Sequence, residues 1–180
     1  TWYYSKIAIS DLDGDGDLDI LASAYSGSVC WHENEGEGNF GERNVLSDAS
    51  GRADSVIATD IDGDGDMDAI VPDYWGDEIV TFRNDGSGNF DGRFVIATDA
   101  DRPVSVYAAD LDGDGDMDVL SASMLDDKVA WYENDGSEGF TEHEITTSAD
   151  GPRSVYAADV DGDGDMDVLS ASQHDDKIAW

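Results

Sequence analysis

Residues 110–118 read Asp-Leu-Asp-Gly-Asp-Gly-Asp-Met-Asp, which places five carboxylates within nine positions of the chain. These carboxylates repel one another unless a cation lies among them, and the two glycines allow the backbone to curl tightly around such a centre. Calcium takes about six to eight oxygen ligands, which alternating aspartates can supply. We therefore predict a calcium site whose ligands are the side chains of Asp110, Asp112 and Asp114, the main-chain carbonyl of Asp116, and Asp118 closing the shell.

The pattern matches only the first half of an EF-hand calcium loop. Ser121 stands at position 12, where an EF-hand has a glutamate, and no amphipathic helical pattern flanks the loop. We therefore interpret it as a nine-residue loop between two strands, closed by its own aspartate. The pattern begins again at Asp11, Asp60 and Asp159, so the repeat period is 49 or 50 residues, the length of a four-stranded propeller blade. A functionless acidic segment would not keep glycines at fixed offsets.

The composition restricts the classes of partner. The 180 residues carry a formal net charge of −34, and twenty of the 43 acidic residues lie in the four loops, five in each. Four bound calcium ions would reduce the net charge to about −26. The remaining field repels nucleic acid phosphates and anionic lipid, so we expect no nucleic acid partner. The sequence also has no run of apolar residues long enough for membrane insertion.

Each repeat has the same order of short apolar and polar segments. An apolar run such as 105–109 precedes the loop, a second run such as 118–123 follows it, and a third run such as 128–132 ends at the turn residues 134–136. A more polar fourth strand begins at Phe140 in the third repeat, and at Phe40 and Phe90 in the first two. No segment has a helical period. The sequence therefore predicts an all-β protein, a β-propeller of four-stranded antiparallel blades.

Several apolar positions recur from repeat to repeat. Trp31, Trp131 and Trp180 occupy one position, with Thr81 as the exception, and such rings are expected to pack between blades. Loop position 8 holds an apolar residue in every copy, and we expect it to hold the loop onto its sheet; the residues are Leu18, Met67, Met117 and Met166. The single cysteine, Cys30, lies where the other repeats have Val or Ala, which favours a buried core residue over a reactive thiol.

The motif Asp-x-Asp-Gly-Asp-Gly-x-x-Asp, as in residues 159–167, is framed by Ser-Val-Tyr-Ala-Ala at 154–158 and Leu-Ser-Ala-Ser at 169–172. With these residues the chain resembles the FG-GAP/VCBS repeat family, the integrin-α-type β-propellers, over essentially its whole length. The resemblance implies one calcium ion per loop, about four in all, bound by every copy of the motif. The implied side-chain ligands are Asp11, Asp13, Asp15, Asp19, Asp60, Asp62, Asp64, Asp68, Asp110, Asp112, Asp114, Asp118, Asp159, Asp161, Asp163 and Asp167, and the main-chain carbonyls are those of Asp17, Asp66, Asp116 and Asp165.

The number of repeats departs from the family pattern. Such propellers usually have seven blades, whereas this sequence holds three full repeats, at about 5–54, 55–104 and 105–153, and an incomplete fourth at 154–180. We expect this single repeat region to be part of a larger propeller. An assembly in which one chain completes the open blade of the next is the alternative.

The segments opposite the calcium loops are predicted to carry the function, because they vary most between repeats. Aromatic rings stack on the apolar faces of sugars, and forked polar groups fix the orientation of a ligand. We therefore predict a site for a carbohydrate or protein ligand, with the candidate residues Tyr25, Tyr74, Trp75, His174, Arg52, Arg102 and Arg153. The alternative is that these arginines only pair with nearby aspartates.

A calcium-binding repeat protein that acts as a binding or adhesion module is our first prediction of function. We expect it outside the cell or at the cell surface, because such acidic loops suit millimolar calcium. A structural subunit of a surface fibre or layer ranks second, and the propeller domain of a polysaccharide-degrading enzyme ranks third. His32, His143 and His174 are the conceivable bases, but they occupy different repeat positions. We therefore predict that the chain is not an enzyme.

Overall fold

The computed structural model describes residues 4–48, 51–137 and 139–180, and in this part of the chain every regular element is a β-strand. The strands form four antiparallel sheets in chain order, the blades of a β-propeller, which confirms the predicted fold class. Blade 1 contains β1 (Tyr4–Ser10), β2 (Asp19–Ala24), β3 (Ser28–His32) and β4 (Asn44–Asp48), and blade 2 contains β5 (Ile57–Thr59), β6 (Asp68–Asp73), β7 (Glu78–Asn84) and β8 (Phe90–Ala97). Blade 3 contains β9 (Pro103–Ala109), β10 (Asp118–Ser123), β11 (Lys128–Asn134) and β12 (Phe140–Thr146), and blade 4 contains β13 (Pro152–Ala158), β14 (Asp167–Ser172) and β15 (Lys177–Ala179).

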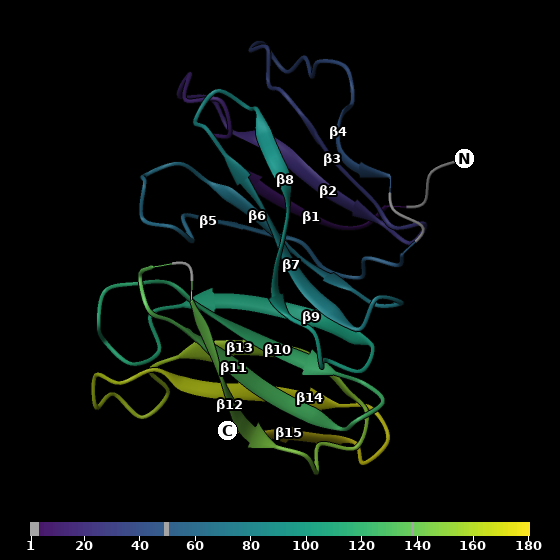
Figure 1. Cartoon of the computed structure of the whole chain (residues 1–180), viewed down its shortest axis with the longest axis vertical. Helices are drawn as coiled ribbons and strands as arrows, with labels where there is room; N and C mark the ends of the chain where they lie inside the picture. The colour runs from purple at the N-terminus through teal and green to yellow at the C-terminus, as the bar shows by residue number, and fades with distance from the viewer. Residues whose placement is uncertain (1–3, 49–50, 138) are drawn as a thin grey trace.

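The blades follow one another through the molecule in chain order, from the purple strands of blade 1 to the yellow strands of blade 4 (Figure 1). The first strands β1, β5, β9 and β13 contact one another in succession, so they form the inner side of the array. The fourth strands β4, β8 and β12 are the outer edges of their sheets. Within each blade, the aspartate-rich loop joins the first and second strands at one end, and the turn between the second and third strands lies at the other end.

Three hydrophobic clusters fill the spaces between successive blades. Between blades 1 and 2 lie Leu21, Val29 and Trp31 with Val71, Val80 and Phe82. Between blades 2 and 3 lie Ile70 and Ile79 with Val119, Ala130 and Tyr132, and between blades 3 and 4 lie Leu120 and Val129 with Val155. All six residues of β10 are buried because blade 3 has a neighbour on both faces. This packing explains the near-continuous small and apolar sequence of the second and third strands.

Three of the four apolar residues at loop position 8 do not hold their loops onto the sheets, which corrects the expectation from the sequence: Leu18 is 58% exposed, and Met117 and Met166 are also exposed. Met67 is half-buried and packs against the cluster between blades 1 and 2, as expected. Position 2 is buried more deeply in the first two loops, where Leu12 and Ile61 are almost fully buried. The reason is a hydrogen bond: the position-2 amide donates to the buried position-9 carboxylate, which turns the position-2 side chain into the space between blades.

The fourth strand of blade 1 begins later than the sequence predicts. Phe40 forms only an isolated bridge with Asn34, and β4 starts at Asn44. Nδ1 of His32 lies 3.2 Å from the carbonyl oxygen of Gly41. This carbonyl would accept a backbone hydrogen bond if the pairing of β3 with β4 extended this far. In blades 2 and 3 the strand begins at Phe90 and Phe140, as predicted.

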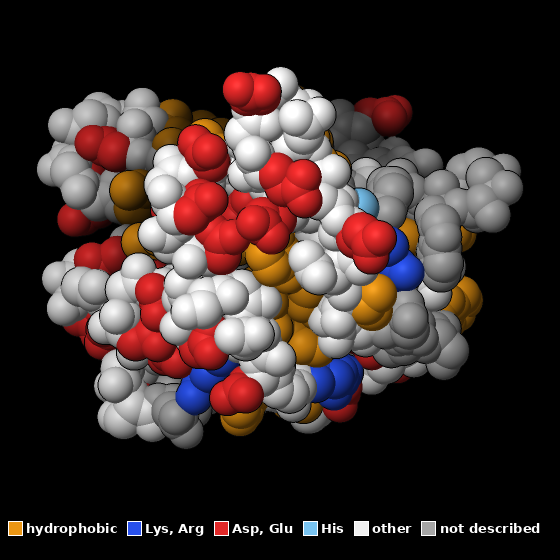
Figure 2. Space-filling model, turned by 90° about the horizontal axis from the view of Figure 1, so that it is seen from above, with side chains coloured by type: hydrophobic (Ala, Val, Ile, Leu, Met, Phe, Trp, Pro, Cys, Tyr) orange, Lys and Arg blue, Asp and Glu red, His pale blue; other side chains and the backbone are white. Residues whose placement is uncertain are grey.

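Acidic side chains dominate the surface. Seen from the end at which blade 1 lies, carboxylates gather above and to the left of a strip of apolar side chains, and Lys and Arg side chains lie near its lower end (Figure 2). Trp31 is buried between blades 1 and 2 and Trp131 packs against the cluster between blades 3 and 4, as predicted. For Trp180 the prediction is wrong: its ring is 69% exposed, because no further blade of the described structure covers that face of blade 4. Cys30 is fully buried, which confirms its expected place in the core. No helix in the described ranges is long and apolar enough to cross a membrane.

Candidate functional site

The first aspartate of each loop fixes the curl of the backbone. In the third loop, Oδ1 of Asp110 accepts a hydrogen bond from the amide of Gly113 (2.7 Å) and Oδ2 accepts one from the amide of Gly115 (3.1 Å). Both glycines have positive φ angles, 81° and 102°, which residues with a Cβ rarely adopt. The same pair of hydrogen bonds occurs in the other three loops. The Asp-Gly alternation therefore specifies one loop conformation that gathers the aspartates on its inner side.

The last aspartate of the loop is buried beneath it. In blade 3, Oδ2 of Asp118 accepts from the amide of Leu111 and Oδ1 accepts from the amide of Asn134, both at 2.8 Å. Asp19 and Asp68 make the same two bonds in blades 1 and 2. Burial raises the pKa of Asp68 to about 6 and raises the pKa of Asp118, and the neighbouring carboxylates add to both shifts. A buried carboxylate of this kind is best compensated by a cation.

Three aspartates in every loop offer carboxylate oxygens within 4.8 Å of one another. Positions 1 and 3 meet in all four loops, joined by position 5 in the first loop and by position 9 in the others. These groups are Asp11, Asp13 and Asp15; Asp60, Asp62 and Asp68; Asp110, Asp112 and Asp118; and Asp159, Asp161 and Asp167. A donor set made only of carboxylate oxygens is the kind that calcium prefers, so these residues fit the ion that the sequence predicts. A bound ion would supply the positive charge that neutralises the cluster.

The position-7 side chains are turned toward another part of the blade. The Asp116 carboxylate lies so close to Gly136, in the turn between β11 and β12, that a Cβ at this glycine would clash with it. Asp66 lies against Gly86 in the same way in blade 2. The main-chain carbonyl at position 7 thus remains the predicted contribution of these residues to the metal shell.

Without divalent ions, the protein is expected to be more stable at about pH 5 than at about pH 7.5. The pKa of Asp68 rises from 3.8 to about 6 on folding, so between these values the folded state binds more protons than the unfolded state. The free energy of unfolding therefore falls as the pH rises through this window. Calcium should reverse the trend, because ions compete with protons for the same carboxylates. Thermal unfolding at both pH values, in chelator and in calcium, measures the effect; greater metal-free stability at the higher pH would contradict it.

An asparagine clamp between blades is a feature that the sequence analysis missed. Nδ2 of Asn134 donates to the carbonyl of Ile61 in the preceding blade (2.8 Å) and to the carbonyl of Met117 in its own loop (3.1 Å). Asn84 joins Leu12 and Met67 in the same way, at 2.7 Å and 3.1 Å. The signal in the sequence was an asparagine at one position of every full repeat, 34, 84 and 134. The sequence pattern itself indicates only the start of a turn at this position.

Five of the seven candidate ligand residues lie together at the end of the blades opposite the loops. The guanidinium carbon of Arg52 lies 4.2 Å from the ring centre of Tyr25 and 4.3 Å from that of Tyr74. Arg102 lies 5.5 Å from the ring of Tyr74 and 5.1 Å from that of Trp75. We call these five residues the arginine–aromatic ladder. It spans the junctions between blades 1, 2 and 3, with Tyr25 and Trp75 more than half exposed and Tyr74 buried.

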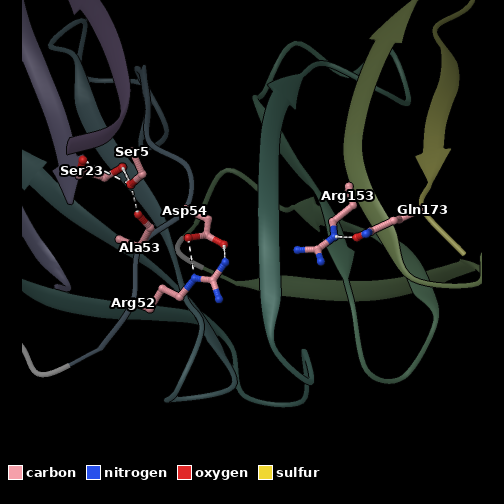
Figure 3. A network of polar contacts seen from close by, with 7 residues as sticks. All are labelled: Ser5, Ser23, Arg52, Ala53, Asp54, Arg153 and Gln173. Carbon is pink, nitrogen blue, oxygen red and sulfur yellow. Dashed lines mark hydrogen bonds and ion pairs between the residues drawn. The ribbon is translucent and has the colours of Figure 1, made fainter. Parts of the chain in front are cut away.

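The ladder is held in position by hydrogen bonds from its own segments. Nε of Arg52 donates to Oδ1 of Asp54 (2.7 Å), so this arginine does pair with a nearby aspartate (Figure 3). It also lies over the rings of Tyr25 and Tyr74. The hydroxyl of Ser5 on β1 donates to the carbonyl of Ala53 (2.6 Å), which ties the segment before β5 to blade 1. The amide of Tyr74 donates to the carbonyl of Arg52 at 2.9 Å. The ladder is thus supported by contacts on both sides of a blade junction.

The other two candidate residues belong to blade 4. Nε of Arg153 donates to Oε1 of Gln173 at 2.7 Å, and the exposed His174 follows that glutamine (Figure 3). The other histidines lie elsewhere: His32 is on β3, and His143 on β12 stacks on Trp131 and contacts Glu133 through Nε2 at 2.6 Å. The three histidines are therefore distributed over three blades.

Comparisons with known proteins agree with this description. A family model described as FG-GAP-like repeat matches residues 11–71, 69–121 and 114–170. No curated protein matches the sequence. Among solved structures, the chain is similar to an Agrocybe aegerita lectin whose structure concerns specific recognition of non-reducing terminal N-acetylglucosamine, with 22% identity and a TM-score of 0.67 over 95% of this chain and 48% of that chain.

Two further solved structures share the fold. The V. cholerae biofilm matrix protein Bap1 is 22% identical with a TM-score of 0.59, over 100% of this chain and 31% of that chain. The Photorhabdus luminescens Tc holotoxin pore is 20% identical with a TM-score of 0.56, over 96% of this chain and 8% of that chain. The chain spans about half the length of the lectin and less of the other two.

Proposed function

The chain belongs to the FG-GAP-like repeat family, and from this premise we propose that it is an extracellular, calcium-stabilised module that binds carbohydrate or protein ligands. The observation that carries the proposal is the arginine–aromatic ladder. Its exposed rings, Tyr25 and Trp75, offer flat apolar surfaces, and its guanidinium groups offer several donors in a fixed plane. This combination is suited to a sugar, which has both apolar ring faces and hydroxyl groups.

The contacts that fix the arginine–aromatic ladder favour ligand binding, because its side chains are already ordered before a ligand binds. Arg52 is fixed between two rings and by Asp54, and Tyr74 is buried, so the free protein already holds these side chains in place. Preorganised side chains lose less conformational entropy when a ligand binds. The similarity to a lectin that recognises a terminal sugar supports carbohydrate as the first ligand class to test.

Trp75→Ala is expected to weaken glycan binding about tenfold or more, because exposed tryptophans at binding sites often contribute more than 1.4 kcal/mol. The matched control is Trp180→Ala, which removes a ring of similar exposure next to blade 4 (69% against 60% for Trp75). A glycan array with the wild-type chain identifies a ligand, and calorimetric titration of both variants measures the change. Equal affinities of Trp75→Ala and Trp180→Ala for that ligand would refute the ladder as its site.

A structural subunit is a second candidate function, favoured by two observations. Apolar residues are exposed on blades 1 and 4, among them Ile9 and Ile178, and one protein of similar fold is a biofilm matrix protein. Negative-stain microscopy separates the candidates, because assembly through blade faces gives concentration-dependent filaments or rings. We rank catalysis below both, since the three histidines lie in different blades.

A further inference from the structure

Blade 4 exposes the face that each of the other blades buries against the next blade. At the junction of blades 1 and 2, blade 1 contributes four apolar side chains that are at most 5% exposed: Leu12, Leu21, Val29 and Trp31. Their equivalents in blade 4 are Val160, Leu169, Ile178 and Trp180. Ile178 is 80% exposed, and Val160 and Trp180 are also exposed. A contiguous apolar surface of this kind marks a contact site.

Blade 1 exposes the complementary face. The residues of blade 2 that pack against blade 1 include Val56, Ala58 and Phe90. Their equivalents in blade 1 are 47–60% exposed, and they are Ile7, Ile9 and Phe40. Blades 1 and 4 lie at opposite ends of the array, so these two faces do not cover each other within one chain (Figure 1).

The tryptophan of blade 4 has a matching glycine on blade 1. At the junction of blades 1 and 2, the ring of Trp31 lies so close to Gly88 that a Cβ at this glycine would clash with it. Gly38 is the equivalent glycine of blade 1, and the space beside it is open. The exposed ring of Trp180 can therefore lie against Gly38 of another chain, as Trp31 lies against Gly88.

The polar groups of the asparagine clamp are also present on the two faces. The carbonyl of Leu12 accepts from Nδ2 of Asn84 (2.7 Å) and from the amide of Gly88 (3.0 Å), both in the following blade. In the described residues, neither Asn34 of blade 1 nor the Val160 carbonyl of blade 4 has the corresponding partner in another blade. Asn34 of one chain and Val160 of another would supply the donor and the acceptor that each lacks.

We propose that the exposed face of blade 4 binds the exposed face of blade 1 of a second copy of this chain, so that the two copies follow one another as consecutive blades. A second copy fits because its blade 1 carries the apolar residues, the glycine and the asparagine that the internal junctions use. Each chain uses a different face, so the contact is heterologous and produces rings or filaments. This inference rests on the structural subunit given above as the second candidate function, and it names the partner in that assembly.

The acidic loops do not prevent such a junction. Asn84 and Asn134 each contact the loops of two neighbouring blades, so these loops already lie side by side within the chain. Bound calcium would neutralise part of their charge, and at physiological ionic strength charges more than about 8 Å apart are largely screened. Association is therefore expected to be stronger in millimolar calcium with added salt than in calcium at low salt.

Ile178→Asp and Ile7→Asp change the two faces separately. Both side chains are exposed in the single chain, so the fold should remain intact, which thermal unfolding checks. Sedimentation velocity at a series of concentrations, in calcium and salt, should show dimers or larger species of the wild-type chain. Each variant alone is expected to associate at least tenfold more weakly, because the contact would bury an unpaired carboxylate.

Ile145→Asp is the matched control. It adds the same charge on the outer strand β12, at a position that is similarly exposed in blades 1 and 2, where the residues are Val45 and Val95. Because the internal junctions leave this position exposed, Ile145→Asp should associate like the wild-type chain.

An equimolar mixture of Ile178→Asp and Ile7→Asp decides whether the contact is head to tail. One variant keeps blade 1 intact and the other keeps blade 4 intact, so the mixture should form dimers with a single junction and no larger species. A wild-type chain that stays monomeric at every concentration, or a mixture that stays as monomeric as its components, would overturn the proposal and leave these faces to another occupant.

Two further outcomes separate this inference from the proposed functions. Assembly of the wild-type chain that persists unchanged in both variants would reject this junction while the structural role stands. Glycan titration of the variants tests the ladder by itself, so a monomeric chain that binds glycan would reject the second copy and support the first proposed function.

Discussion

Removal of calcium is expected to lower the melting temperature by roughly 20–40 °C. A ligand that binds only the folded state at a hundredfold excess over its Kd contributes about 2.7 kcal/mol, so four sites contribute about 11 kcal/mol. Domains are stable by about 5–15 kcal/mol in total, so the ions would account for most of the stability. Calorimetry or circular dichroism in millimolar calcium and in EDTA measures the difference.

The stoichiometry of binding provides the control for this experiment. Asp112→Asn removes one carboxylate from the third loop, where Asp110, Asp112 and Asp118 meet, and should reduce the number of bound ions by one. Asp91→Asn changes an exposed carboxylate on β8 outside the loops and should leave that number unchanged. The same melting temperature in calcium and in EDTA would show that the loops are not stabilised by divalent ions.

Asn134→Ala is expected to destabilise the folded chain by about 2–4 kcal/mol. The substitution removes three hydrogen bonds, because Oδ1 of Asn134 also accepts from the amide of Gly136, and it leaves the carbonyls of Ile61 and Met117 without this donor at the junction of two blades. The bond to the Ile61 carbonyl is buried, and a buried carbonyl that loses its partner costs more free energy than the loss of an exposed bond. Urea unfolding in calcium, with the midpoint and slope fitted together, measures the change.

Asn34→Ala is the matched control for the clamp. Among the described residues, Nδ2 of Asn34 donates only to the carbonyl of Leu18 in its own blade, and this bond is exposed. We expect its loss to cost less than about 1 kcal/mol. Equal effects of the two substitutions would show that the contact with the preceding blade adds nothing, and that the asparagine only shapes its own loop.

The features that depend on short stretches of chain could be predicted from the sequence. The loop conformation follows from aspartates and glycines within nine residues, and hairpins of neighbouring strands follow from alternating apolar and turn segments. The fold class, the strand order and the buried Cys30 are accordingly confirmed. The position-8 prediction is wrong for Leu18, Met117 and Met166, because hydrogen bonds from the position-2 amide to the last aspartate decide which side of the loop faces inward, and periodicity cannot show these bonds.

The features that depend on contact between blades could not be predicted. The Asn134 clamp reaches a carbonyl 73 residues earlier in the chain, and Asn84 reaches one 72 residues earlier. The ladder was predicted only in part: its five residues were named, but so were Arg153 and His174, which lie on blade 4. The sequence shows Thr81 as an exception among tryptophans, but not that Thr81 lines a cavity of about 270 Å³ together with Phe140 of the next blade.

The asparagine clamps connect each blade to the blade before it in the sequence. In the described residues, the side-chain amides of Asn84 and Asn134 both donate to the loop of the preceding blade, which is synthesised first. A new blade can therefore pack against the preceding, already folded blade as soon as its third strand has left the ribosome, before the following blade is synthesised. Growth in the order of synthesis suits a protein whose neighbouring repeats are so alike, because each new sheet meets its correct neighbour first.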